Sequence, residues 1–133
     1  MGVTPIDTDT QIDAILADGA RLWNGHRFFE CHDKLEEAWR LVKHEKKAEP
    51  AQDPRRDAIH GVILYAAAYV HWQRGNAVGV ARKLEDARRT FARTEMRKLG
   101  PLDLATFRSA VEADLERAKQ GQAFDARRVP RID

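Results

Sequence analysis

The sequence has a single cysteine, Cys31, among its 133 residues. A disulfide within the chain is therefore excluded, as is a metal site built from several thiolates of one chain. Glycine is also scarce, with 8 residues, and no repetitive tract is present. A composition of 43% hydrophobic and 33% charged residues is then typical of a compact protein rich in helices and not of a disordered segment.

Long apolar runs are missing as well. The longest, Val62 to Val70, ends at His71 and is far shorter than the roughly 20 residues that span a bilayer. Residues 1–9 contain neither a basic residue nor a long apolar stretch, so no signal peptide is predicted. We therefore expect a cytoplasmic protein without a membrane span. The net charge of +2 is too small to indicate a nucleic-acid partner.

Apolar residues at helical spacing predict five helices separated by turn signals. Their expected ranges are about 10–24, 28–46, 56–73, 77–99 and 104–120. Thr8, Asp9 or Thr10 can cap the first helix, and Asp103 can cap the last. No strand pattern is recognised, and residues 1–8 and 122–133 are expected to be irregular tails.

The third predicted helix has almost no polar side. A helix that is apolar all round belongs at the centre of a domain. Because the connections between the helices are short, antiparallel neighbours are favoured. The sequence therefore predicts an all-α fold, a compact bundle of about five helices around the central helix 56–73, in a single domain over residues 1–133.

His32 and Glu36 interrupt the apolar side of the second predicted helix. They lie one turn apart and point the same way, beside Phe29, Leu35 and Trp39. We expect the pair to lie near the core, with Phe29 and Trp39 shielding it from water. Burying an imidazole and a carboxylate requires either an internal hydrogen-bond network or a ligand. In the first case, Glu36→Ala leaves a buried donor without its acceptor, at a cost of about 1 to 3 kcal/mol.

The central helix carries a histidine near each end, His60 and His71, on the same side of the helix. Because they are separated by roughly 16 Å along the axis, the two histidines cannot bind the same metal ion. One of them can join His32 and Glu36, and two imidazoles with a carboxylate can hold zinc or iron and leave room for water. The set that we favour for a divalent metal is His32, Glu36 and His71.

The fourth predicted helix has four arginines on one side: Arg82, Arg89, Arg93 and Arg97. Such a row can contact phosphates, but Asp86 lies within it and no aromatic residues alternate with it for base stacking. A solvated face or a contact with another subunit is the favoured interpretation. Aromatic residues on the central helix, Tyr69 and Trp72, add apolar surface that indicates a homodimer.

The segment from Trp23 to Arg40 resembles the opening of the bacterial and archaeal family called domain of unknown function 309. The hallmark of that family is a His, a Glu four residues on and a Trp three residues further, matched here by His32, Glu36 and Trp39. A second block is also similar to the family: Gly61-Val62-Ile63, Ala66-Ala67-Ala68, His71-Trp72-Gln73-Arg74-Gly75-Asn76 and Gly79.

The resemblance covers about residues 22–84. It implies a small all-helical fold in a family without an established activity, and it assigns no catalytic residue. Two positions depart from the family pattern: Asp33 stands where Glu is usual, and Leu64 where Gln is frequent. Since Leu64 lies on the same side as His60 and His71, its apolar side chain disfavours a polar pocket there.

These observations favour a non-enzymatic module that binds a small molecule or a protein partner, with His32, Glu36 and Trp39 in a buried network beside Phe29, His60 and His71. The alternative is a metal-dependent hydrolase or oxidase. In that alternative, His32 and Glu36 hold a divalent ion together with His60 or His71, and the ion activates water.

Overall fold

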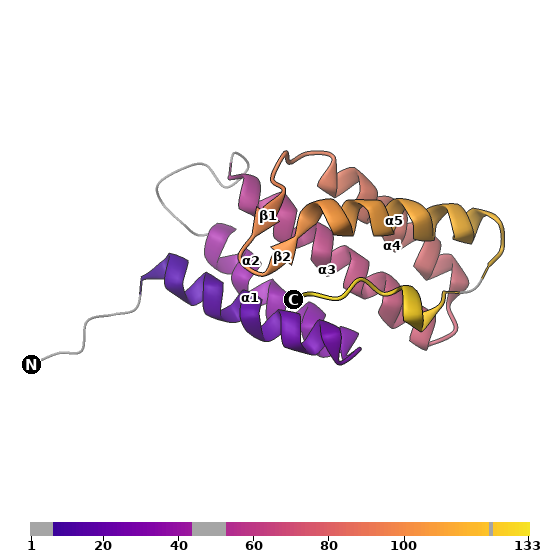
Figure 1. Ribbon diagram of the computed structural model, residues 1–133, viewed down its shortest axis with the longest axis horizontal. Helices are drawn as coiled ribbons and strands as arrows, with labels where there is room; N and C mark the ends of the chain where they lie inside the picture. The colour runs from indigo at the N-terminus through magenta and orange to yellow at the C-terminus, as the bar shows by residue number, and fades with distance from the viewer. Residues whose placement is uncertain (1–6, 44–52, 123) are drawn as a thin grey trace, which may run out of the picture.

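The computed structural model describes residues 7–43, 53–122 and 124–133, and within them the fold is all-helical (Figure 1). The α helices are α1 (Thr8–Asn24), α2 (Phe28–Lys43), α3 (Pro54–Gln73), α4 (Ala77–Phe91) and α5 (Leu104–Lys119). A small antiparallel hairpin, β1 (Lys98–Leu99) with β2 (Leu102–Asp103), connects α4 to α5, and a short 3₁₀ helix, η2 (Ala126–Arg128), follows α5. In this part of the chain no helix is long and apolar enough to cross a membrane.

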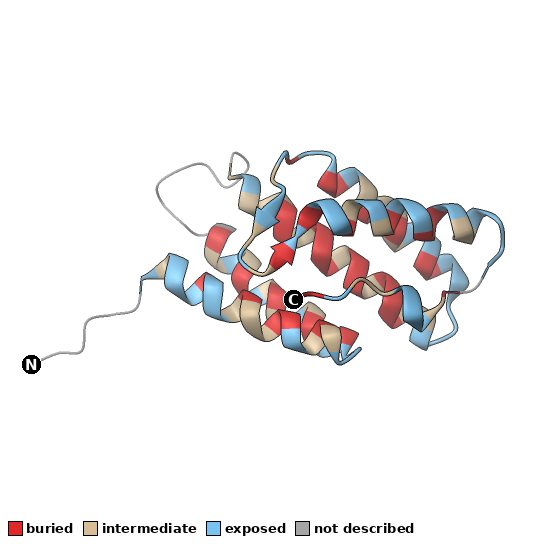
Figure 2. Cartoon of the chain, viewed as in Figure 1, coloured by how far each residue is buried: buried red, intermediate tan, exposed pale blue. Residues whose placement is uncertain are grey.

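Helix α3 forms the centre of the bundle, as its apolar composition predicts. It packs most extensively against α2 on one side and α4 on the other, and the α1–α2 contact is of similar extent to the α2–α3 contact. Figure 2 shows buried residues along most of its length. The prediction of a helical bundle around a central apolar helix is therefore confirmed.

An aromatic cluster fills the space between α1, α3 and α5. Trp23 is fully buried, and its ring centroid lies 5.3 Å from that of Tyr65, 5.7 Å from that of Tyr69 and 5.0 Å from that of Phe107. Edge-to-face and tilted arrangements of this kind are the favourable geometries for aromatic pairs. The cluster thereby joins the first and last α helices through the central one.

Only some of the helix ends lie at the positions that the sequence predicts. Asp7 caps α1 by accepting a hydrogen bond from the backbone N–H of Thr10 at 2.8 Å, so the predicted cap is one residue or more too late. Asp53 caps α3, which begins at Pro54, two residues before the predicted start. The predicted extension of the second helix to residue 46 lies outside the described residues, as do residues 1–6 of the predicted tail.

The predicted extension of the fourth helix to Leu99 is wrong, and so is the absence of a strand. Helix α4 ends at Phe91, and Leu99 pairs with Leu102 in the hairpin. The reason is a residue distant in sequence: the Arg108 guanidinium of α5 donates hydrogen bonds to the carbonyl oxygens of Thr94 at 2.5 Å and Met96 at 2.8 Å. These bonds satisfy backbone groups that a longer helix would have paired internally.

The segment after α5 is irregular apart from η2, but it is not a loose tail. It runs back between α5 and α1 (Figure 1), and the side chains of Phe124 and Ile132 are buried, with 8% and 6% of their surface exposed. The ring of Phe124 lies 4.8 Å from that of Tyr69. The segment therefore covers part of the aromatic cluster.

Helices α3 and α4 approach each other closely at Gly61. A Cβ atom at this position would lie 2.5 Å from the ring of Phe91. Glycine is therefore required by the packing of the two helices and not by backbone conformation, since no positive φ is found there.

We expect Gly61→Ala to lower the free energy of unfolding by about 1 to 3 kcal/mol, because the added methyl group displaces Phe91 or separates α3 from α4. This loss should appear although alanine is the better helix former. Gly25→Ala is the matched control, since φ is −84° and the nearest atom to an added Cβ lies 3.5 Å away. Chemical denaturation followed by circular dichroism measures both changes, and equal effects would contradict the close approach.

Candidate functional site

A groove with a volume of about 370 Å³ runs along α3 between α2 and α4. The described residues that line it are Phe29, His32, Glu36, His60, Ile63, Leu64, Ala67, Val70, His71, Arg74 and Lys83. The structure thus brings five of the six residues predicted for the site to one surface. Trp39 is not among the lining residues, although its ring lies 5.5 Å from that of His60.

The floor of the groove is an apolar stripe of α3. Ile63, Leu64, Ala67 and Val70 follow the spacing of one helix face, which neither α2 nor α4 covers completely. With a rise of about 1.5 Å per residue, the floor from Ile63 to Val70 is roughly 10 Å long. The groove therefore combines an apolar floor with polar side chains on its walls and at its ends.

His32 and Glu36 face α3 from the wall formed by α2, but they are not deeply buried. Their side chains are 28% and 36% exposed, and Nε2 of His32 lies 3.7 Å from Oε1 of Glu36. Glu36 also pairs with Arg40 at 3.2 Å. The predicted shielding by Phe29 is wrong, since Phe29 is 51% exposed with the Arg74 guanidinium 5.8 Å above its ring.

This exposure changes the expected cost of Glu36→Ala. A partly exposed ion pair on one helix contributes roughly 0.3 to 0.5 kcal/mol, well below the penalty for a buried donor without an acceptor. The pair is therefore better suited to meeting a ligand than to stabilising the bundle. The interpretation of His32, Glu36 and Trp39 as a buried network is not supported by this geometry.

His60 lies at one end of the groove, in a half-buried position. Burial lowers the pKa of its imidazole, as do the charges of Arg56, Arg93 and Lys83, whereas the charge of Asp57 raises it. His60 is thus neutral near neutral pH and offers a hydrogen-bonding group without a charge.

His71, at the other end, stabilises the turn between α3 and α4. Its Nδ1 lies 3.1 Å from the side-chain amide nitrogen of Asn76, and the Oδ1 of Asn76 accepts a hydrogen bond from the N–H of Gly79 at 3.0 Å. Asn76 is the N-cap of α4, and Gly75 has a φ of +73°. The part of the second family-like block from His71 to Gly79 therefore forms the turn between α3 and α4. In this turn Gly75 adopts a positive φ and Asn76 caps the following helix.

The ligand set predicted for a metal is not brought together. Among the described residues, the group whose potential ligand atoms lie within 4.8 Å of one another is His32, Asp33 and Glu36. Neither His71 nor His60 belongs to it, because each occupies an end of the groove. Asp33 takes the place that we expected for a second histidine, with Oδ1 3.4 Å from Nδ1 of His32.

The predicted row of arginines on one side of the fourth helix is also wrong. Arg93 and Arg97 lie beyond the end of α4, so the four side chains do not share one helix face. Arg89 forms an ion pair with Glu85 at 3.2 Å. This feature therefore contributes nothing to the case for a phosphate-binding surface.

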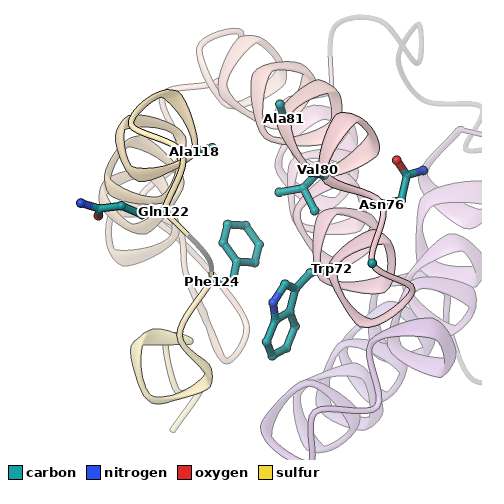
Figure 3. Close-up of a pocket in the computed structure, with 10 residues that line it drawn as sticks. Trp72, Asn76, Val80, Ala81, Ala118, Gln122 and Phe124 are labelled. Atoms are coloured by element: carbon teal, nitrogen blue, oxygen red, sulfur yellow. The ribbon is translucent and has the colours of Figure 1, made fainter.

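A second cavity of about 340 Å³ lies between the end of α3, the start of α4 and the end of α5. Figure 3 shows the rings of Trp72 and Phe124 side by side in it, with Val80 pointing toward them and Gln122 pointing away. The ring centroids of Trp72 and Phe124 lie 6.2 Å apart. This cavity is lined in part by residues after α5, unlike the groove.

The buried polar network of the protein lies elsewhere, and the sequence analysis missed it. Asp114 of α5 is only 5% exposed and accepts hydrogen bonds from the hydroxyl groups of Tyr65 at 2.5 Å and Tyr69 at 3.1 Å. The signal was present, because Asp114 falls within the apolar stripe of α5 between Val111 and Leu115. The same reasoning that selected His32 would have selected Asp114.

Burial governs the ionisation of this network. It raises the pKa of Asp114, although the two tyrosine hydrogen bonds and the charges of Arg117 and Arg128 act in the opposite direction. Burial, together with the neighbouring carboxyl group, likewise raises the pKa of Tyr69. Because the network is enclosed and its groups satisfy one another, it is structural.

The groove lies in the part of the chain that matches a known protein family. The model of a family described as "Domain of unknown function (DUF309)" matches residues 16–83, half of the chain. The chain belongs to this family. Every residue that lines the groove lies within the DUF309 match, whereas Ala118, Gly121, Gln122 and Phe124 of the second cavity lie outside it. No curated protein matches the chain.

The buried carboxyl group predicts a specific pH dependence. Because the folded state raises the pKa of Asp114 above its ordinary value of 3.8, this group stabilises the fold fully below that value. The stabilisation is lost as the pH rises through the folded pKa. We expect Asp114→Asn, which keeps an oxygen acceptor but cannot ionise, to become more stable relative to the wild type as the pH rises to neutral.

Urea denaturation of both proteins from acid to neutral pH measures this difference, in which the contributions of other carboxyl groups cancel. Asp114→Ala is the companion variant: it leaves both tyrosine hydroxyls without their acceptor and should be less stable than Asp114→Asn by about 1 to 3 kcal/mol at every pH. Parallel stability profiles for the wild type and Asp114→Asn would contradict the raised pKa.

Proposed function

We propose that the protein is a non-enzymatic binding module whose groove between α2 and α4 takes a small organic acid with an apolar body. The observation that supports this most directly is the pairing of an apolar floor with two basic side chains, Arg74 and Lys83. Small-molecule sites commonly combine an apolar lining with a few convergent polar groups, in volumes of roughly 300 to 1,000 Å³.

The balance of charge in the groove favours an acidic ligand. The carboxylate of Glu36 is compensated by Arg40 and His32. Among the described residues, by contrast, no carboxylate forms an ion pair with Lys83 or with Arg74, whose guanidinium instead lies over Phe29. A ligand carboxylate would supply the missing partner for one of these cations.

The apolar floor accounts for the rest of the ligand. Each methylene group that leaves water for this surface contributes about 0.8 kcal/mol. The neutral imidazole of His60 and the partly exposed His32 add hydrogen-bonding groups along the wall and at the end of the groove. A linear or ring-shaped apolar body that ends in a carboxylate therefore fits the chemistry of the site.

We expect the saturated linear carboxylates hexanoate, octanoate and decanoate to bind with increasing affinity, by about tenfold for each two carbons, because each added methylene is buried on the floor. Isothermal titration calorimetry measures these affinities. Ala67→Phe should abolish binding by filling the middle of the floor. Lys83→Met should weaken it by about tenfold, since one charge-assisted contact is lost.

Ala81→Phe is the matched control, because Ala81 lines the second cavity and not the groove. It should leave binding unchanged. Loss of binding in Ala81→Phe with retention in Ala67→Phe would place the ligand in the second cavity. Equal binding of decanol and decanoate would contradict the role of Lys83 and Arg74.

A divalent metal ion is the second candidate ligand, and it is favoured by the cluster of His32, Asp33 and Glu36 on α2, of which His32 and Glu36 line the groove. One imidazole and two carboxylates are ligands that zinc, manganese and iron accept, and they leave coordination positions for water. We do not extend this candidate to a hydrolase or oxidase, since His60 and His71 do not join the cluster.

Calorimetric titration of the untagged protein with zinc or manganese tests this candidate. If it is right, we expect binding with one ion per chain that His32→Gln abolishes, while His26→Gln, a change at an exposed histidine outside the cluster, leaves it intact. Metal binding that survives His32→Gln, or none in the wild type, would remove the candidate.

A further inference from the structure

The side chain of Asn24, at the end of α1, forms hydrogen bonds with the backbone of the segment after α5. Its side-chain Oδ1 accepts a hydrogen bond from the backbone N–H of Ile132 at 2.8 Å, and its Nδ2 donates to the backbone carbonyl of the same residue at 2.5 Å. A side-chain amide that forms hydrogen bonds with both the N–H and the carbonyl of one residue reproduces the hydrogen bonding of a paired β-strand.

A second contact fixes the direction of the segment. The indole Nε1 of Trp23 donates a hydrogen bond to the carbonyl of Pro130 at 2.6 Å. Proline at this position restricts the segment to an extended conformation, which lowers the entropy lost on binding. Trp23 and Asn24, called here the Trp23–Asn24 clasp, thus bind the carbonyl of Pro130 and both the carbonyl and the N–H of Ile132.

Side chains of the segment alternate in the manner of a bound peptide. Ile132 is buried, whereas its neighbours Arg131 and Asp133 are exposed. Main-chain hydrogen bonds combined with a pocket for every second side chain are the features by which proteins recognise extended peptides. The recognition therefore depends on an extended backbone and one apolar side chain, and not on the charges at positions 131 and 133.

The clasp and its occupant belong to different parts of the chain. Trp23 and Asn24 lie within the DUF309 match, whereas residues 124–133 lie outside it. The occupant is thus a tethered peptide that fills a site on the family module. Tethering supplies an effective concentration of about a millimolar, so a site of this kind can be filled without high intrinsic affinity.

We propose that the Trp23–Asn24 clasp is a peptide-binding site for an extended segment of the form Pro-x-Ile, and that a second copy of this chain can supply the segment in trans. The chain's own residues 130–132 occupy the site in cis. Exchange of the segment between two copies then joins them through the same contacts, as in domain swapping. The inference is independent of the proposed function, because neither clasp residue lines the groove.

Two full-length variants test the proposal when they are mixed. Ile132→Asp places a charge where an apolar side chain is buried, so it frees the clasp, while Asn24→Ala removes the clasp and leaves an intact segment. We expect each variant alone to be monomeric by analytical ultracentrifugation and the mixture to form a one-to-one complex. A mixture that stays monomeric while both variants remain folded overturns exchange between copies.

A labelled peptide with the sequence of residues 124–133 tests the site itself. By fluorescence anisotropy, it should bind the Ile132→Asp variant at least about tenfold more tightly than the wild type, whose own segment competes in cis. A peptide carrying Ile132→Asp is the matched control and should not bind. If Ile132→Asp does not fold by circular dichroism, Ile132→Ala replaces it, and absence of peptide binding to the folded variant overturns the proposal.

Discussion

Nearly every side of α3 is kept away from water, and the arrangement of the other elements follows from this constraint. Helices α2 and α4 cover two sides of α3, and the aromatic cluster around Trp23 joins it to α1 and α5. The strip of α3 that remains between α2 and α4 becomes the floor of the groove. The candidate site is therefore a consequence of incomplete coverage of the central helix.

The helical architecture could be predicted because it depends on local patterns. Apolar residues at helical spacing identified the five α helices, and the cap Asp103 was predicted at the position that the structure confirms. The error at the end of α4 has a long-range cause, because Arg108 binds carbonyls 12 and 14 residues before it. The anchoring of Ile132 depends on Asn24, 108 residues away, which no local pattern indicates.

The sequence predicted which side of α2 carries the candidate site, but not how far its side chains are buried. Helical spacing correctly placed His32 and Glu36 on the side that faces α3. Their exposure depends on whether another element covers them, which the spacing on one helix does not reveal. His71 lies at the end of the groove, but its side chain contacts Asn76 in the turn between α3 and α4, a role that the spacing of the histidines along α3 does not indicate. Asp114 was not predicted as a site of hydrogen bonding, and its tyrosine partners on α3 lie 49 and 45 residues away in sequence, where local spacing does not indicate them.

The hydrogen bonds to Asp114 also bear on the boundaries of the family. Tyr65 and Tyr69 lie inside the DUF309 match, but the carboxyl group that accepts their hydroxyl hydrogens lies 31 residues beyond its end at residue 83. The matched region by itself would leave two phenols pointing toward an unfilled position. In this chain the acceptor for both tyrosines therefore comes from outside the DUF309 match, so the folding unit extends further than the stretch by which the family is recognised.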